Sequence, residues 1–333
     1  IIGSGLVIFI LGILWAIMVN LDWIPGSPET GNLAGIGGLI LSMSVYLSRN
    51  VAQTNRRLQH NLVEVKRLSR ERLEQERLNR EKEIQRKLLE AENQRKSYEL
   101  EEARTLQLSM LPKNFPSLSN WNISVDMRTA SEVGGDYYDF SRNRDENMLV
   151  TLGDAAGHGM RAGIVVAAAK SYFHTLAHRV DNYSILKQIS DGIRNMNVRT
   201  MFMGLTLIEV NHNNLTLMTA GMPPALWYKR SEDKVERITQ KGLPLGTPRD
   251  YPYQEQKLAV GSGDCVLVMS DGLMELFNEE REMLGLERIE DRFKEVAGKN
   301  ADAIIEEMNK LADDWGDGQE PEDDITILVF KAN

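Results

Sequence analysis

The chain has 333 residues, of which 42% are hydrophobic and 26% are charged, and this balance excludes wholesale disorder. Its net charge of −9 divides into −2 over residues 1–48 (two acids), +4 over 49–110 (15 Lys/Arg against 11 Asp/Glu) and −11 over 111–333 (24 against 35). The acidic C-terminal part has no basic stripe, which argues against nucleic acid as a partner, and the single Cys265 excludes an intrachain disulfide framework.

Two uncharged stretches open the chain, residues 1–21 and 30–48, and each has the length of about 20 residues that crosses a bilayer once. The residues between them include Pro25, Gly26 and Pro28, which break helices and favour a tight turn. The alternatives are a buried hairpin of a soluble protein and a signal peptide, but a signal peptide would not be followed by a second span. Residues 1–48 are therefore predicted to form a two-helix transmembrane hairpin.

The charges beside these stretches predict an orientation. The connecting turn has no Lys or Arg, whereas Arg49, Arg56 and Arg57 follow the second stretch. By the positive-inside rule, everything after residue 48 is expected in the cytoplasm, as in a multi-pass protein of the cell membrane. The chain begins without Met and without a polar flank, so we expect the hairpin to be truncated at its N-terminus, with further spans or a sensor domain upstream.

Residues 49–110 are expected to form one long helical linker. No Pro or Gly occurs from residue 50 to 110, and Glu, Arg, Lys, Gln and Leu dominate until Leu111-Pro112 ends the pattern. Apolar positions such as Leu88 and Ala91 keep only parts of the 3,4 spacing of a coiled coil. The alternatives are a solvated single helix and a parallel coiled coil that transmits a signal. Because a lone helix of this length buries nothing, we favour a homodimer through the linker.

Residues 111–333 are numerous enough for one domain with a sizeable core, and no proline-rich linker divides them. Apolar and polar residues alternate in several short runs joined by turns, which favours antiparallel sheets. The expected strands are 121–127, 148–152, 202–210, 215–219, 225–229, 265–269 and 325–330, and the expected helices are 162–177, 185–198, 286–297 and 303–315. Strands and helices in separate blocks predict an α+β fold in which helices cover sheet faces.

Acidic residues stand beside glycine at the ends of the expected strands. They are Asp136 after Gly134-Gly135, Asp154 after Gly153, Asp271 before Gly272, and the pair Asp323-Asp324 before the last strand. A single Asp beside Gly is ordinary turn chemistry. If the sheets bring all four sites together, however, their carboxylates repel one another unless cations intervene. All-oxygen ligands select Mg²⁺ or Mn²⁺ over zinc, so these acids are candidate metal ligands.

Seven motifs resemble, in order and rough spacing, the metal-dependent protein phosphatases (the PPM family), and specifically their bacterial SpoIIE-type branch. The motifs lie at residues 106–112, 133–139, 153–159, 220–224, 242–246, 270–272 and 323–326. The resemblance covers about residues 104–331, so residues 111–333 are interpreted as a SpoIIE-type phosphatase domain. It implies a two-sheet antiparallel β-sandwich flanked by helices, in α-β-β-α order, with two Mn²⁺ or Mg²⁺ ions in a cleft at one end.

The resemblance also implies roles for residues at the motif positions. Asp154 would bridge the two ions, and the carbonyl of Ala155 would bind one of them. Asp136 would serve one ion, and Asp271 with Asp323 the other. Asp324 is the alternative to Asp323 as a ligand. Water held between the ions would then attack phosphorus, so Asp136 and Asp154 are the expected catalytic residues.

Two positions depart from the pattern of the family. Met222 replaces a histidine that usually precedes the proline pair, and Ala155 stands where many relatives have Gly. Position 155 would act through its carbonyl, so the second change matters little. His158 invites a role as general acid, but the motif register favours a structural loop histidine.

The implied substrate is a protein carrying phosphoserine or phosphothreonine, and in this branch it is typically a small STAS-type anti-sigma-factor antagonist. The leading hypothesis is therefore a membrane-tethered, metal-dependent protein serine/threonine phosphatase. One alternative is a catalytically silent scaffold that binds the phosphoprotein, but a binding module gains nothing from a cluster of buried carboxylates. Another is a two-metal hydrolase of a small phosphoester, which the acidic domain does not favour.

Overall fold

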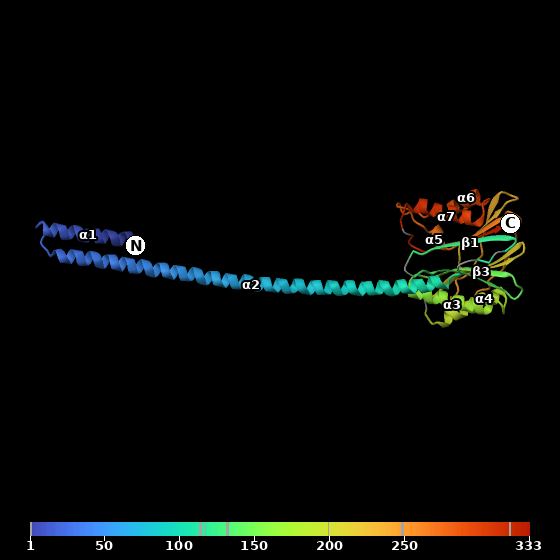
Figure 1. The fold of residues 1–333 in the computed structure, drawn as a ribbon, viewed down its shortest axis with the longest axis horizontal. Coiled ribbons are helices and arrows are strands. Elements are labelled where there is room, and N and C mark those ends of the chain that lie inside the picture. Colours follow the sequence, from blue (N-terminus) through green and yellow to red (C-terminus); the bar gives the residue numbers. More distant parts are fainter. Residues whose placement is uncertain are drawn as a thin grey trace. The chain divides into compact units, whose positions relative to one another are not determined.

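A computed structural model describes residues 2–112, 115–116, 118–130, 133–198, 200–247, 250–319 and 321–333. Clustering of contacts divides the chain into two compact units, Ile1–Glu92 and Asn93–Asn333. We describe each unit by itself. Figure 1 shows the elements of both units in sequence colours.

The first unit contains helix α1 (Ile2–Asn20) and most of helix α2 (Pro28–Met110). Glycines let the two helices approach closely: a Cβ placed on Gly12 would lie 2.5 Å from the carbonyl oxygen of Gly31 and 2.9 Å from Cα of Gly35. Close approach through small residues is typical of helix pairs in membranes. By length and composition, α1 and the apolar start of α2 are both candidate membrane spans.

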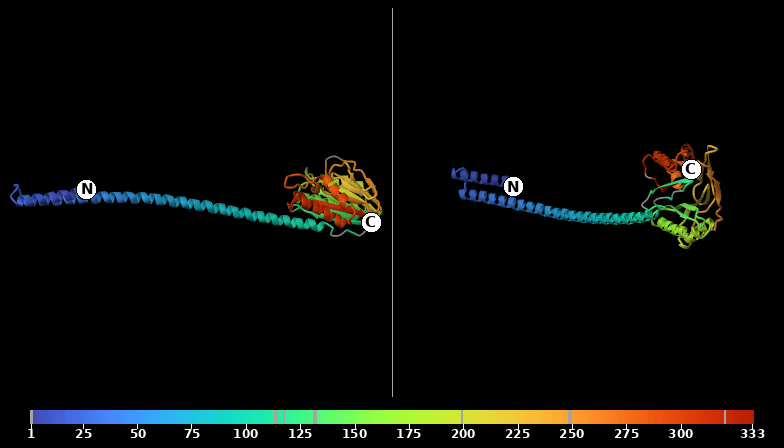
Figure 2. Two further views of the ribbon diagram at one scale, coloured as in Figure 1. Left: turned by 90° about the horizontal axis from the view of Figure 1, so that it is seen from above. Right: turned by 45° about the vertical axis from the view of Figure 1, so that its right-hand side comes forward.

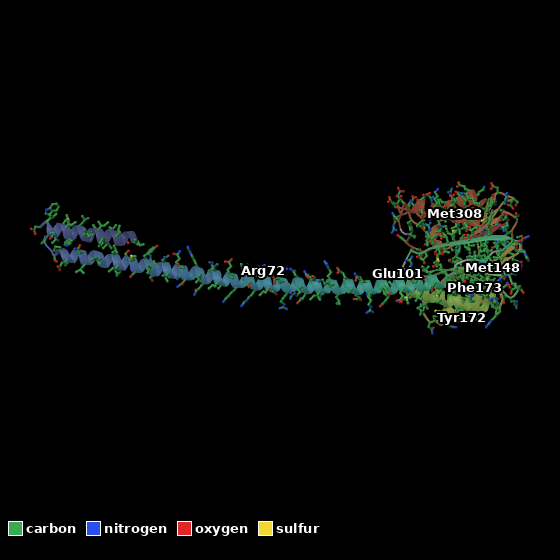
Figure 3. All side chains as sticks on the ribbon, in the orientation of Figure 1. Arg72, Glu101, Met148, Tyr172, Phe173 and Met308 are labelled. Carbon is green, nitrogen blue, oxygen red and sulfur yellow. The ribbon has the colours of Figure 1, made fainter. Side chains whose placement is uncertain are left out.

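Helix α2 is continuous, so the second apolar stretch and the expected linker form one element. The helical prediction for residues 50–110 is thus confirmed, with α2 ending at Met110, directly before Leu111-Pro112. Its side chains point outward along the helix, as Arg72 does in Figure 3. Exposed pairs such as Glu83 with Lys87, 2.9 Å apart, add modest support to the helix.

The second unit contains two antiparallel five-stranded sheets, in the orders β1-β10-β9-β6-β7 and β2-β3-β4-β5-β8. The strands are β1 (Trp121–Arg128), β2 (Asp136–Arg142), β3 (Met148–Ala155), β4 (Met203–Asn211), β5 (Asn214–Ala220), β6 (Ala225–Lys229), β7 (Lys234–Ile238), β8 (Gln256–Ala259), β9 (Cys265–Met269) and β10 (Ile325–Ala332).

Helices cover the outer face of each sheet, as the two turned views in Figure 2 also show. Helices α3 (Met160–Leu176) and α4 (Asn182–Asn195) pack on the β2–β8 sheet, while α6 (Gly285–Val296) and α7 (Ala301–Gly316) pack on the β1–β7 sheet. The short helix α5 (Asp271–Met274) follows β9 directly. The arrangement is the α-β-β-α sandwich that the motifs implied, so the predicted fold class is confirmed.

Alternation along the strands builds the layers of the core. On β3, Leu149 faces the α3 side, while Val150 and Leu152 face the other sheet. On β9, Val266 packs between the sheets and Leu267 packs under α6 and α7. Because β3 and β9 are buried on both faces, the sheets hold the ends of these strands in fixed positions, where candidate acids lie.

All seven expected strands and all four expected helices of this unit are present, with ends within a few residues of those predicted. Three strands were not expected. Strand β2 follows the glycines at 134–135, β7 reads Lys-Val-Glu-Arg-Ile with three charges in five residues, and β8 is only four residues long. Strands β7 and β8 are edge strands, where charge and short length are tolerated because one side lacks a neighbour.

Candidate functional site

The fold brings the predicted acids to one end of the sandwich. Asp136 begins β2 and pairs in register with Asp154 at the end of β3. Asp271 follows β9 at the start of α5, and Asp323 lies two residues before β10. Ser270 follows β9 in one sheet, and its hydroxyl donates to Oδ2 of Asp136 on β2 of the other sheet over 2.8 Å. The strand ends of both sheets therefore meet at this point.

Asp136 is the most buried of these carboxylates, with 1% of its surface exposed. Its Oδ2 accepts hydrogen bonds from the hydroxyls of Ser270 and Thr326, whereas its Oδ1 has no hydrogen-bond partner. Burial, together with repulsion by Asp154, raises the pKa of Asp136 well above its ordinary range, against the effect of the two hydroxyls. A buried oxygen without a donor is costly in a protein, and a cation is the ligand that would satisfy it.

Asp154 lies among other carboxylates. Burial and then repulsion by Asp271 and Asp323 raise its pKa from 3.8 to about 7. The pKa of Asp323 is raised as well, first by burial and then by Asp271. Glu275 is the residue directly after α5, and its pKa is raised by burial and by repulsion from Asp271. These groups disfavour one another's charge, which is the electrostatic condition that a bound cation relieves.

A backbone oxygen joins the cluster through Gly135. A Cβ placed on Gly135 would lie 2.5 Å from the carbonyl oxygen of Ala155 and 2.7 Å from Oδ1 of Asp154. Only glycine leaves this space open, so the carbonyl and the carboxylate share a small oxygen-lined recess. This recess, the orphaned oxygen of Asp136 and the purely carboxylate side chains fit a hard divalent ion such as Mg²⁺ or Mn²⁺.

The carboxylates do not form a closed cage in this conformation. Within the described residues, no group of three or more His, Cys, Asp or Glu side chains is arranged closely enough to hold an ion. The fit therefore rests on the donor set and on mutual repulsion, and the structure gives no coordination geometry.

Asp323 and Asp324, the two alternatives for the last ligand, have different surroundings. Asp324 is 3% exposed, and both of its oxygens accept backbone N–H groups: Oδ1 from Ala130 over 2.8 Å, and Oδ2 from Gly135 over 2.7 Å and Asp136 over 3.3 Å. Asp323 is less buried, and its Oδ1 accepts one bond, from the backbone N–H of Asp324 over 2.8 Å. Both carboxylate oxygens of Asp324 therefore fix the backbone of nearby residues. Oδ2 of Asp323 accepts no hydrogen bond from the residues that the structure describes, so it is available to another partner.

We predict that Asp324→Ala destabilises the metal-free protein by about 3 kcal/mol, because it removes a buried acceptor from three backbone donors. Asp323→Ala removes an acceptor from only one and relieves repulsion by Asp271, so it should change stability by less than about 1 kcal/mol. Urea denaturation in chelator, followed by circular dichroism, measures both. Equal losses in the two variants would contradict this assignment of roles.

Two further motif residues have defined neighbours. His158 lies close enough to Asp323 to lower the pKa of that carboxyl. The sulfur of Met222 lies where a Cβ on Gly204 would be, 2.8 Å away, and Gly204 pairs in register with Asp154. Met222 therefore packs against β4 and the core between the two sheets.

The sequence did not identify the groups that support the acids. Ser270 and Thr326 stood in the quoted motifs without a role, and Glu275 was not considered. A small hydroxyl residue beside a strand-end Asp was a usable signal for the first two. The place of Glu275 close to Asp271 depends on the turn of α5, which the sequence pattern did not predict.

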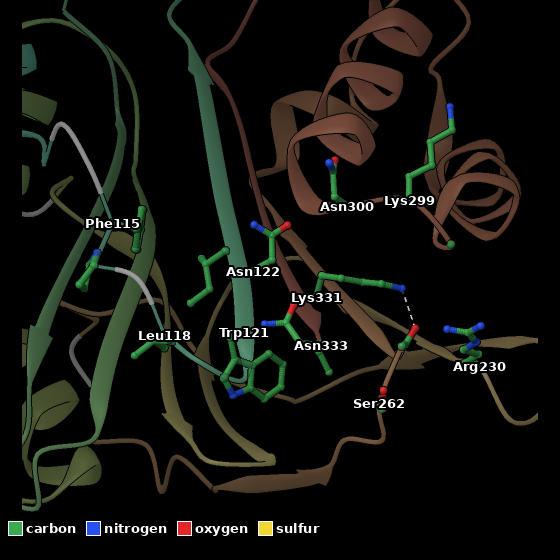
Figure 4. Close-up of a pocket in the computed structure, with 15 residues that line it drawn as sticks. Phe115, Leu118, Trp121, Asn122, Arg230, Ser262, Lys299, Asn300, Lys331 and Asn333 are labelled. Carbon is green, nitrogen blue, oxygen red and sulfur yellow. Dashed lines mark hydrogen bonds between the residues drawn. The ribbon is translucent and has the colours of Figure 1, made fainter.

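A separate pocket of about 640 Å³ lies at the opposite end of β1 and β10 (Figure 4). Among the described residues that line it, the charged ones are Arg230, Lys299 and Lys331, all of them basic. The buried amine of Lys331 donates to the carbonyls of Gly263 and Ala297, each over 2.6 Å, and so ties three segments together. This pocket has none of the predicted site residues.

Comparison with known proteins gives three findings that agree with this geometry. The family described as stage II sporulation protein E (SpoIIE) matches residues 144–333, more than half of the chain. Phosphoserine phosphatase RsbU of Bacillus subtilis (strain 168) is 25% identical over 241 residues, which cover 70% of each protein. The family match lies within the second unit and includes Asp154, Asp271 and Asp323, and it begins after Asp136.

Solved structures show the same fold. The SiaA-PP2C domain of Pseudomonas aeruginosa superposes with a TM-score of 0.63 at 20% identity, covering 73% of this chain and 98% of that one. RsbX in complex with magnesium gives a TM-score of 0.50 at 16% identity, covering 66% and 99%. The chain therefore belongs to the SpoIIE family, and its second unit holds a PP2C-type serine/threonine phosphatase domain.

Proposed function

We propose that the protein is a membrane-tethered, metal-dependent phosphatase that hydrolyses phosphoserine or phosphothreonine on a protein, with water as the nucleophile. The observation that carries the proposal is the cluster of Asp136, Asp154, Asp271 and Asp323, of which Asp136 is buried, Asp154 and Asp271 are partly exposed and Asp323 is exposed. Among the described residues Oδ1 of Asp136 has no hydrogen-bond partner, and the pKa values of Asp136, Asp154 and Asp323 are raised. A scaffold that only binds a phosphoprotein has no use for such a cluster.

Each residue has a role in this proposal. Asp154 and the carbonyl of Ala155 hold the centre of the site, with Asp136 on one side and Asp271 and Asp323 on the other. Ser270 and Thr326 fix Oδ2 of Asp136, which leaves Oδ1 for a cation. Two Mn²⁺ or Mg²⁺ ions, when bound, would lower the pKa of a water molecule and neutralise charge on the phosphoryl oxygens.

Covalent catalysis by Ser270, or by the thiol of Cys265 at the other end of β9, is disfavoured. Cys265 is fully buried, and burial raises its pKa to about 12, so it does not supply a thiolate. Ser270 is also fully buried, and its hydroxyl is committed to Asp136. The acids instead surround a space where the chain supplies oxygen ligands, which supports attack by water.

The proposed substrate is a small STAS-type anti-sigma-factor antagonist carrying a phosphoserine or phosphothreonine. The support is the SpoIIE family match and the similarity to phosphoserine phosphatase RsbU. The acidic surplus of residues 111–333 agrees with a substrate recognised through a local phosphoryl group and not through an extended anionic surface.

We further propose three regions with different tasks: a transmembrane hairpin over 1–48, a helical linker over 49–110 and the phosphatase domain over 111–333. Support for the hairpin comes from the length and composition of α1 and the start of α2. The Arg residues that follow the second stretch favour a cytoplasmic catalytic domain. The linker would pair with that of a second copy, because leucines along α2 such as Leu62, Leu73 and Leu88 are more than half exposed in a single chain.

If the linker pairs in this way, Leu88→Asp with Ala91→Asp should dissociate the dimer and change turnover severalfold, because two charges would enter the apolar seam. Sedimentation of the full chain in detergent micelles measures the first effect, and phosphate release measures the second. The control is Asn79→Asp with Asn93→Asp, which adds the same charge at other exposed positions of α2. A seam variant that sediments and turns over like this control would contradict pairing at residues 88 and 91.

The function is tested with the full chain in detergent micelles and two phosphorylated substrates. We expect phosphate release from a phosphoserine protein and from an aryl phosphate in Mn²⁺, and none in chelator. Binding of the phosphoprotein without release in Mn²⁺ would support a silent scaffold. Faster hydrolysis of a nucleotide than of any phosphoprotein would support a small-phosphoester hydrolase.

A further inference from the structure

The segment 133–135, which leads into Asp136, has all three of its carbonyl groups bonded. The carbonyl of Val133 accepts from the backbone N–H of Gly159 over 2.8 Å, and that of Gly135 accepts from Ala155 over 2.9 Å. The carbonyl of Gly134 accepts from a side chain, Nε2 of Gln107, over 2.8 Å. All three residues of the segment are buried, so water does not replace a lost donor.

The opposite side of the segment is equally confined. The carboxylate of Asp324 accepts the N–H groups of Gly135 and Asp136, and a Cβ on Gly134 would collide with the same carboxylate. Gly134 is thus held between Asp324 and Gln107. Since the next residue but one is Asp136, movement of this segment displaces the carboxylate that the site depends on.

Gln107 comes from outside the β-sandwich. It lies in the last turn of α2, four residues before Leu111, and only 5% of its surface is exposed. One turn earlier, Arg104 donates to Oγ1 of Thr129 over 2.8 Å, at the residue after β1. The end of the long helix therefore contacts Thr129 and Gly134, and Gln107 is the residue of that helix that donates to a carbonyl of segment 133–135.

We propose that Gln107 is a positioning residue for the metal site: its amide holds the carbonyl of Gly134 and thereby fixes Asp136, so that the last turn of α2 forms part of the scaffold of the site. The proposal rests on the proposed function, because it takes Asp136 as a metal ligand. A change in the helix at Gln107 would then alter affinity for the ion without any contact between helix and ion.

The competing account is that Gln107 only anchors the helix. In that case its loss lowers stability but leaves metal affinity unchanged. In our account its loss leaves the buried carbonyl of Gly134 without a donor, the segment shifts, and the affinity for Mn²⁺ falls. Metal affinity therefore separates the two accounts.

The test uses the full chain in detergent micelles with three variants. Gln107→Glu keeps the size of the side chain but cannot donate to the carbonyl, and Gln107→Met keeps its length without a donor. Gln94→Glu makes the same chemical change at an exposed position of the same helix and serves as the control. Titration calorimetry gives the dissociation constant for Mn²⁺, and aryl phosphate hydrolysis gives the Mn²⁺ concentration for half-activation and the kcat at saturation.

We expect Gln107→Glu and Gln107→Met to raise both Mn²⁺ constants about tenfold, which corresponds to about 1.4 kcal/mol, while kcat at saturating Mn²⁺ stays within about twofold. Thermal denaturation in chelator reports folding, so Gln107→Met decides the outcome should Gln107→Glu not fold. Mn²⁺ constants equal to those of Gln94→Glu would overturn the proposal and leave the proposed function intact. A wild-type chain that neither binds Mn²⁺ nor hydrolyses would overturn both.

Discussion

Asp154→Asn is expected to lower kcat for phosphate release by at least about 10³-fold, which corresponds to about 4 kcal/mol of activation free energy. Asp154 stands opposite Asp136 across the β2–β3 pair and is repelled by Asp271 and Asp323. Asp154 therefore lies close to each of the other three acids, Asp136, Asp271 and Asp323. Asparagine has nearly the same size as aspartate but carries no charge, so the substitution should weaken binding of the ions and leave the packing unchanged.

The control for this experiment is Asp145→Asn, an exposed position in the turn at the other end of β2 and β3. It should hydrolyse like the wild type. Asp271→Asn should show a loss of the same order as Asp154→Asn. If Asp154→Asn retained more than about a tenth of wild-type kcat, Asp154 would not bridge the ions.

The second large effect is a loss of stability in the metal-free protein as the pH rises. The folded-state pKa of Asp154 is about 7, above its ordinary value of 3.8, so the folded state holds a proton that the unfolded state releases. The stabilisation is complete below about pH 4 and is lost as the pH rises through about 7. At about 1.4 kcal/mol for each pH unit between these values, the loss reaches about 4 kcal/mol.

Urea denaturation in chelator between pH 4 and 8 measures this dependence. Asp154→Asn should flatten the profile and be more stable than the wild type at pH 8, because an amide does not ionise. Saturating Mn²⁺ should stabilise the wild type most at the alkaline end, where the carboxylates are charged. A wild-type profile in chelator that is flat, or that rises with pH, would contradict the mutual repulsion of these acids.

Much of the fold could be predicted from the sequence because burial follows local patterns. The short apolar runs at residues 148–152 and 265–269 predicted β3 and β9, and the absence of Pro and Gly predicted the helix over 50–110. Strand β7 escaped prediction because three of its five residues are charged and its two buried residues, Val235 and Ile238, are three positions apart and show no alternation. The continuity of α2 from the first apolar residues to Met110 also escaped, since composition changes sharply where the backbone does not.

The candidate site also has one part that the sequence predicted and one part that it did not. The acids were predicted because strand ends beside glycine are visible in the sequence. Their support was not, because it depends on long-range contacts: Thr326 reaches Asp136 across 190 positions of the chain, and Gln107 reaches Gly134 from another element. A glutamine in a charged helix resembles a solvated residue, and only the fold shows that it is buried.

The contacts of Gln107 and Asp324 also bear on regulation. Both act on the backbone before Asp136, Gln107 from the last turn of α2 and Asp324 from the residue before β10. In a protein whose linker carries a signal, this segment is where the signal would meet the acids. Dimer formation and Mn²⁺ affinity would then both depend on the conformation of α2.

We propose that these acids form a site for two divalent ions. Titration calorimetry of the full chain with Mn²⁺ tests it most directly. We predict two ions bound per chain, with at least one lost in Asp154→Asn and both retained in Asp145→Asn. A chain that binds no Mn²⁺, or that binds it equally well in Asp154→Asn, would contradict the claim.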